Sequence, residues 1–202
     1  MSNKPYKGFE PNWLLTPAPE NSYRSIFRWG DPNFFKYPKE SLYTLMKEKF
    51  QMTDDDIKAY SDDTGFDPVE LPDHPVQLAP EHIDALKAIV GEQNLSTTDY
   101  DRLSVAYGAT AYDLLRLRHK RIVPDVVLYP ETSEQVEQIV AYSTEHHIPL
   151  YVYGGGSSVT RGVEPTKGGI SLDMRRNFNK VISFNEIDQT ITVQAGMSGP
   201  DL

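Results

Sequence analysis

The feature that most constrains this chain is a run of three glycines, Gly154-Gly155-Gly156, directly after the apolar stretch 148–153. Glycine loses the most backbone entropy on folding and covers no apolar surface, so three in a row indicate a place where no Cβ is tolerated. The hydroxyl side chains of Ser157 and Ser158 follow. This order favours a loop whose main-chain N–H groups bind a phosphate, with Arg161 as a further donor. A tight structural turn is the alternative.

The loop differs from two common phosphate-binding motifs. No Gly-Lys-Ser/Thr follows the glycines, as it does in a Walker loop, and no G-x-G-x-x-G opens a helix, as it does in a Rossmann fold. Residues 160–165 instead look like more loop. The rest of the chain must therefore identify the ligand.

Composition excludes several classes of function. The 202-residue chain carries a net charge of −9, which argues against nucleic acid and anionic membranes as partners, because both require clustered lysine and arginine. It has no cysteine, and so neither a disulfide framework nor a thiolate metal site. We see no signal peptide and no run of about 20 apolar residues, and therefore expect no transmembrane segment and a cytoplasmic location, with peripheral membrane contact left open.

The first half of the chain reads as short helices between irregular, proline-rich connections. Apolar residues recur at helical spacing in three places, and carboxylates after Thr53 resemble a helix start. The apolar faces are Leu42 to Phe50, Ile83 to Val90 and Leu114 to Leu117.

From Pro124 the pattern becomes a β-α-β unit. A strand over 126–128 precedes a helix that begins with the capping-box spacing Thr132 to Gln135, and the strand 148–153 then enters the glycines. Ligands collect at the carboxyl ends of such strands. Further β-type runs cover 169–173, 181–184 and 190–194, the last two as a hairpin. We expect an α+β fold with a mostly helical region 1–120 and an α/β region 121–202, in a fragment of a longer protein.

Spaced motifs follow one another through the second half: Pro124-Asp125-Val126-Val127, Pro130, Gly154 to Ser158, Ser171-Leu172-Asp173 and Ala195-Gly196. In this order they resemble the FAD-binding (PCMH-type) domain of the vanillyl-alcohol-oxidase family of flavoproteins. Upstream segments resemble the alkyldihydroxyacetonephosphate synthase branch and its bacterial relatives: Arg28-Trp29-Gly30, Phe66-Asp67-Pro68, Leu71-Pro72, Asp101-Arg102, Ala106-Tyr107-Gly108 and Leu114 to Arg118.

The resemblance implies a role for each residue of the loop. Val152, Tyr153, Gly154, Gly155, Gly156, Ser157, Ser158 and Val159 are expected to surround the FAD pyrophosphate. Some branches bond the flavin to a histidine at the place of Ser157, and since serine cannot form that bond, the resemblance implies non-covalent FAD. Val152-Tyr153 departs from the family, in which proline or arginine often precedes the glycines.

The resemblance also bounds what the chain can do alone. The family's catalytic residues and second FAD-contacting subdomain correspond to sequence after Leu202, so no catalytic residue is assigned and the fragment alone is expected to be inactive. In the synthase branch an acyl chain is exchanged for a fatty alkoxide without net oxidation, whereas related folds oxidise D-2-hydroxy acids by hydride transfer. Both chemistries stay open, as does a non-catalytic nucleotide-binding module. The implied substrate is a small molecule or lipid precursor, and a homodimer is left open.

Other polar residues have simpler interpretations. His146-His147 fit a helix C-terminus, where cations suit the dipole, and Asp54-Asp55-Asp56 fit a solvated helix start better than a cation site. Asp101-Arg102 is interpreted as an ion pair at the domain junction. The cluster Arg116 to Arg121 is either a solvated helix end or a phosphate contact. No metal site is expected.

Overall fold

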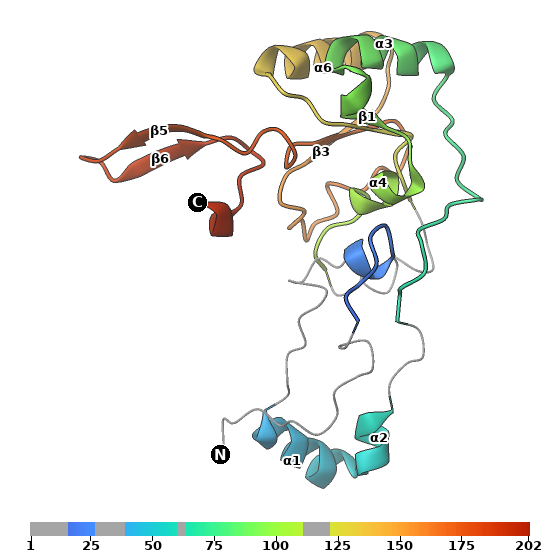
Figure 1. Ribbon diagram of the computed structural model, residues 1–202, viewed down its shortest axis with the longest axis vertical. Coiled ribbons are helices and arrows are strands. Elements are labelled where there is room, and N and C mark those ends of the chain that lie inside the picture. The colour runs from blue at the N-terminus through green and yellow to red at the C-terminus, as the bar shows by residue number, and fades with distance from the viewer. Residues whose placement is uncertain (1–15, 27–38, 60–63, 111–121) are drawn as a thin grey trace. The chain divides into compact units, whose positions relative to one another are not determined.

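The computed structural model describes residues 16–26, 39–59, 64–110 and 122–202 (Figure 1). Three stretches named above lie outside these residues: Arg28-Trp29-Gly30, the expected helix at Leu114 to Leu117 and the cluster Arg116 to Arg121. The chain divides into two compact units, Met1–Pro68 and Val69–Leu202.

The first unit contains short helices. The 3-10 helix η2 spans Arg24–Ile26, and the α-helices α1 and α2 span Glu40–Phe50 and Asp54–Lys58. The predicted helix α1 is confirmed, but its apolar face stays open, because Phe50 is 69% exposed and Leu42 is 47% exposed.

The acidic run in the first unit is a helix start. The Thr53 hydroxyl accepts a hydrogen bond from the Asp56 N–H, and the Asp56 carboxylate accepts one from the Thr53 N–H, which together make a capping box. The hydrogen bonds from Thr53 lower the pKa of Asp56. The carboxylates therefore stabilise the helix end.

A four-stranded sheet is the centre of the second unit. Its strands are β1 (Leu95–Ser96), β2 (Val126–Leu128), β3 (Leu150–Tyr153) and β4 (Ile170–Asp173), in the order β1-β2-β4-β3. β4 runs parallel to both β2 and β3, and β1 is antiparallel to β2. The predicted β-α-β unit is present, but β4 lies between its two strands, which makes β3 an edge strand.

Helices α3 (Pro80–Val90) and α6 (Ser133–Glu145) cover one face of this sheet (Figure 1). α3 starts with proline at its first position, where no N–H is needed. At the start of α6 the Thr132 hydroxyl accepts from the Gln135 N–H, while Gln135 Oε1 accepts from the N–H of Glu131 and not of Thr132. The predicted helix start at Thr132 is thus confirmed, but the Gln135 side chain bonds the N–H of Glu131 where a capping box would have it bond the N–H of Thr132.

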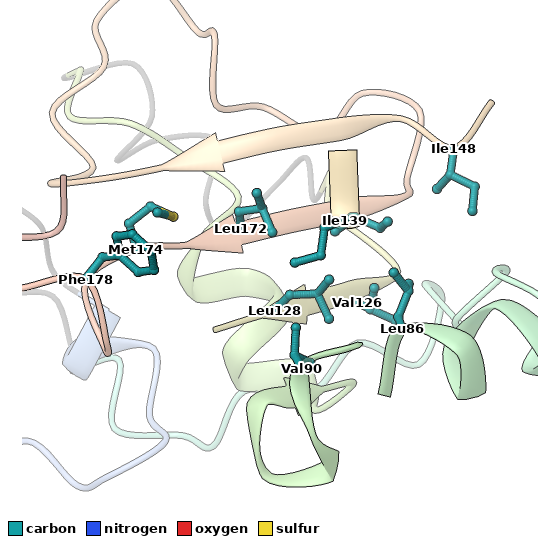
Figure 2. Packing of buried hydrophobic residues seen from close by; sticks show 10 residues of the cluster. Leu86, Val90, Val126, Leu128, Ile139, Ile148, Leu172, Met174 and Phe178 are labelled. Carbon is teal, nitrogen blue, oxygen red and sulfur yellow. The ribbon is translucent and has the colours of Figure 1, made fainter. Parts of the chain in front are cut away.

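Side chains alternate along the strands and form a core on each face. Figure 2 shows the larger core, in which Leu86, Val90 and Ile139 from the helices pack on Val126, Leu128 and Leu172 from the strands. Val127, Tyr129 and Tyr153 face the other side of the sheet, where they pack with Val105. Val105 follows helix α4 (Asp99–Ser104). The 3-10 helix η3 (Glu92–Asn94) links α3 to β1.

The last strands form a separate hairpin, β5 (Val181–Asn185) and β6 (Thr190–Val193), followed by the 3-10 helix η4 (Gly199–Asp201). The predicted hairpin is confirmed. Its apolar side chains are exposed, with Phe184 at 67% and Ile182 at 64%. Among the described helices, none is both long and apolar enough to cross a bilayer.

Candidate functional site

The glycine loop follows β3 at the end of the sheet where the carboxyl termini of all three parallel strands lie. Leu128, Tyr153 and Asp173 are the last residues of β2, β3 and β4. The main-chain N–H of Met174 donates to the Tyr153 carbonyl at 2.9 Å, so the exits of β3 and β4 are joined. This is the end at which open α/β sheets bind ligands.

Two distant segments hold the loop in place. The Ala109 N–H donates to the Ser158 carbonyl at 2.9 Å, and a Cβ on Gly108 would collide with that same carbonyl. On the other side, a Cβ on Gly154 would come within 3.3 Å of the Ala195 carbonyl. Motifs separated by almost ninety residues in the sequence, Ala106-Tyr107-Gly108 and Ala195-Gly196, therefore both contact the loop.

The loop presents main-chain donors. Across the described part of the chain, no hydrogen bond is donated by a main-chain N–H of Gly154 to Val159. Gly155, Ser157 and Val159 are exposed, so an acceptor can approach from solvent, and a run of main-chain donors at the carboxyl ends of parallel strands is suited to an anion that the protein itself does not supply.

The space beside Gly155 is open. A Cβ built on Gly155 meets no atom within 4 Å, and Gly155 is exposed, whereas Gly156 is buried and adopts the left-handed φ of +66°. Gly155 is thus compatible with close approach by a ligand, while Gly156 is required by the protein's own geometry. These observations fit a phosphate-containing group at the loop. The binding role of Val152 to Val159 stays a prediction.

Two arginines near the loop, Arg161 and Arg175, are paired with carboxylates. Arg161, which the sequence suggested as a further phosphate donor, instead makes two hydrogen bonds to Glu164, Nε to Oε1 at 2.6 Å and a terminal nitrogen to Oε2 at 2.7 Å. The Glu164 side chain is only 2% exposed. Arg161 is thus held by a carboxylate three residues along the chain, and its contact with a phosphate stays a prediction.

Arg175 and Arg176 follow β4. Arg175 binds Asp173 through Nε to Oδ1 at 2.9 Å and a terminal nitrogen to Oδ2 at 2.5 Å. Burial favours a lower pKa for Arg175, but hydrogen bonding to Asp173 and its charge outweigh burial and raise it. Arg176 lies over the Tyr129 ring at 4.8 Å from its centroid. Burial, followed by the charges of Asp101 and Asp173, raises the pKa of Tyr129, which keeps its hydroxyl protonated.

The ion pair expected at Asp101-Arg102 has a different carboxylate partner. Arg102 contacts Asp99 at 3.4 Å and donates to the carbonyls of His74 and Pro124, each at 2.8 Å. In helix α4, residues three apart share a face, whereas adjacent residues do not. Burial lowers the pKa of Arg102, and the charge of Asp99 acts in the opposite direction. Arg102 therefore joins three segments of the second unit.

Other candidates lie away from the loop. His146 caps helix α6, as predicted for a helix end, and its ring packs on Tyr142, whose hydroxyl is 2.8 Å from His82 Nδ1. A cavity of about 400 Å³ is lined by Arg102, Asp125 and Gly168, among others. Since Asp125 and Gly168 precede β2 and β4, the cavity lies at the opposite end of the sheet from the glycine loop. No group of three or more metal-binding side chains occurs in the described ranges.

Comparison with known proteins agrees with the motifs. Residues 124–202 match the family described as FAD binding domain. The chain is 28% identical over 178 residues to alkyldihydroxyacetonephosphate synthase from Dictyostelium discoideum, a match that covers 85% of this chain and 29% of that protein. It is 31% identical over 126 residues to the mitochondrial D-lactate dehydrogenase [cytochrome] 1 of Saccharomyces cerevisiae, covering 59% of this chain and 21% of that protein.

A solved structure shows the same fold. The structure of an alkyldihydroxyacetonephosphate synthase superposes with a TM-score of 0.58 at 30% identity, covering 63% of this chain and 26% of the other. The predicted α+β fold, the resemblance and FAD as the cofactor of this domain are thereby confirmed. The chain spans less than a third of the length of these relatives.

Proposed function

We propose that this chain supplies the pyrophosphate-binding part of an FAD-dependent enzyme, with Val152 to Val159 surrounding the FAD diphosphate. The observation that carries the proposal is the set of main-chain N–H groups at Gly154 to Val159, which have no acceptor in the described structure and border the open space at Gly155. Hydrogen bonds from such groups to a charged phosphate each contribute about 1.5–3 kcal/mol.

The cofactor is bound without a covalent link to this loop. Its hydroxyl side chains, Ser157 and Ser158, can donate to phosphate oxygens but cannot form the bond that a histidine makes to flavin in some relatives. When bound, FAD would supply the flavin ring on which the chemistry occurs. The loop's own part is to bind and orient the diphosphate.

Of the two chemistries, that of the synthase has the stronger support. The match to the Dictyostelium alkyldihydroxyacetonephosphate synthase covers 85% of this chain, while that to the yeast D-lactate dehydrogenase covers 59%. The greater coverage favours an enzyme that exchanges the acyl chain of a lipid precursor for a fatty alkoxide. Oxidation of a D-2-hydroxy acid is the second candidate, supported by the 31% identity to the dehydrogenase.

The tests separate the three readings. The complete protein is expected to purify yellow and to release FAD on denaturation. A colourless protein that takes up no added FAD favours a non-catalytic nucleotide-binding module. With FAD bound, bleaching of the flavin by D-lactate under anaerobic conditions supports the dehydrogenase, and exchange of acyl for alkyl without bleaching supports the synthase.

The remaining proposals concern organisation and location. We propose that 1–120 is a mostly helical and irregular region and that 121–202 is the first part of the FAD-binding domain; the compact units divide elsewhere, after Pro68. Limited proteolysis tests the boundary. We also propose a cytoplasmic location with peripheral membrane contact, which cell fractionation tests. A homodimer is tested by size-exclusion chromatography.

A further inference from the structure

The side chain of Tyr153 lies directly beneath the glycine loop. It is 1% exposed, and its hydroxyl donates to the Tyr107 carbonyl at 3.4 Å. A Cβ built on Gly156 would collide with the Tyr153 hydroxyl and would lie 2.6 Å from Cζ of the ring. The tyrosine therefore fills the space that any side chain at position 156 would need.

The ring of Tyr153 is held from a second direction by the chain that leaves β4. The Arg175 guanidinium lies 4.6 Å from the ring centroid, and Asp173 fixes that guanidinium through two hydrogen bonds. The Arg175 main-chain N–H also donates to Asp173 Oδ1 at 3.0 Å. Asp173, Arg175 and Tyr153 thus form a continuous support from the end of β4 to the underside of the loop.

We propose that Tyr153 is a positioning residue that fixes the position of the glycine loop and thereby orients the N–H groups of Gly154 to Val159. The inference deepens the proposed function and rests on it, because those N–H groups are the donors assigned to the FAD diphosphate. N–H to O hydrogen bonds weaken steeply once the distance or angle departs from its preferred range. A small displacement of the loop would therefore weaken several bonds at once.

A role limited to core packing makes a different prediction. Tyr153 belongs to the cluster with Val127 and Tyr129, so its removal must reduce stability in either case. Packing alone, however, needs the ring and not the hydroxyl, and it predicts normal FAD affinity in any variant that folds. The positioning role predicts that FAD affinity falls when the Tyr153 hydroxyl is removed or when a side chain is added at position 156.

The first experiment compares Tyr153→Phe with Tyr151→Phe in the complete protein. Tyr151 is a matched control on the same strand, because its hydroxyl likewise contacts a loop, accepting from the Lys167 N–H at 3.3 Å. Titration of FAD, followed by flavin fluorescence, is expected to show affinity weakened about five-fold by Y153F and unchanged by Y151F. Equal affinities for Y153F and wild type would overturn the proposal.

The second experiment is a double-mutant cycle of Gly156→Ala with Tyr153→Leu. The strain of a side chain at positive φ is the same in both backgrounds, so the cycle isolates the collision with the tyrosine. Both FAD affinity and the apo unfolding midpoint are measured. G156A is expected to weaken FAD binding about ten-fold less, and to lower the midpoint less, in the Y153L background. Equal effects in both backgrounds contradict the proposal.

The outcomes separate this inference from the function on which it rests. If the wild-type protein binds no FAD, the proposed function is wrong. The coupling between G156A and Y153L, measured in the unfolding midpoint of the apo protein, still reports whether Tyr153 supports the loop. Wild-type protein that binds FAD without coupling removes only the inference. If G156A does not fold in the wild-type background, the comparison of Y153F with Y151F decides.

Discussion

Replacing Gly155 with valine is expected to separate ligand binding from folding. The glycine adopts no left-handed φ, and a Cβ there meets no atom within 4 Å, so the apo chain can accept the side chain without strain. Removing a glycine also reduces the entropy of the unfolded chain. The apo unfolding midpoint of Gly155→Val should therefore equal that of wild type or exceed it slightly.

The effect on FAD should be large. The valine side chain would occupy the open space beside the loop and hold the diphosphate away from the N–H groups. Loss of one such charge-assisted hydrogen bond costs about 1.5–3 kcal/mol, which corresponds to a roughly ten- to hundred-fold rise in Kd. If the diphosphate is displaced from two donors, binding should fall below detection at micromolar FAD.

The assay is FAD titration followed by flavin fluorescence, together with thermal unfolding of the apo protein. Gly162→Val is the matched control, since a Cβ on Gly162 also meets nothing within 4 Å and its φ is not left-handed. It should leave both the Kd and the unfolding midpoint near the wild-type values. A G155V protein that folds normally and binds FAD with wild-type affinity would falsify the assignment of the loop.

Three further predictions concern stability. Ser171→Ala should leave the urea midpoint of unfolding unchanged or raise it. Among the described residues, the Ser171 hydroxyl oxygen is the only buried side-chain nitrogen or oxygen without a hydrogen-bond partner. Arg102→Met should lower the free energy of unfolding by about 2–3 kcal/mol, because the carbonyls of His74 and Pro124 lose their donor and Asp99 Oδ1 loses its ion pair; no loss in urea unfolding would contradict the described contacts. Because the pKa of Asp56 is lowered from its usual value of 3.8, its carboxylate stabilises the folded state at pH values above 3.8, and this stability is lost as the pH falls through the folded-state pKa. Circular dichroism should therefore show a smaller loss of helix on acidification for Asp56→Asn than for wild type.

Much of the second unit could be predicted because its signals are local. The strands at 126–128 and 150–153, the helix between them and the hairpin over 181–193 follow from apolar periodicity and capping residues that lie next to one another in the sequence. The position of β4 between β2 and β3 could not be predicted in this way. It depends on the pairings Val126 with Ile170 and Leu150 with Ile170, which join residues that are distant in the chain.

The glycine loop could be located from the sequence, but the segments that contact it could not, and its binding role stays a prediction. The glycine run can be read directly from the sequence, whereas the contacts of Ala109 with Ser158 and of Tyr153 with Tyr107 form only when distant segments meet. Signals for the carboxylate partners were present, since Asp99 and Glu164 each lie three residues from their arginine. Adjacent pairs such as Asp101-Arg102 are a poor guide in a helix, because neighbouring side chains point in different directions.

The pairing of the arginines beside the loop with carboxylates also bears on how fast a ligand arrives. Steering of an anion towards a site over long distances requires net positive charge, and here the guanidinium groups of Arg161 and Arg175 are each matched by a carboxylate in a chain of net charge −9. Arg161 and Arg175 therefore add little to the long-range attraction of an anionic dinucleotide. Raising the ionic strength should accordingly have little effect on the part of the association rate that these two side chains set.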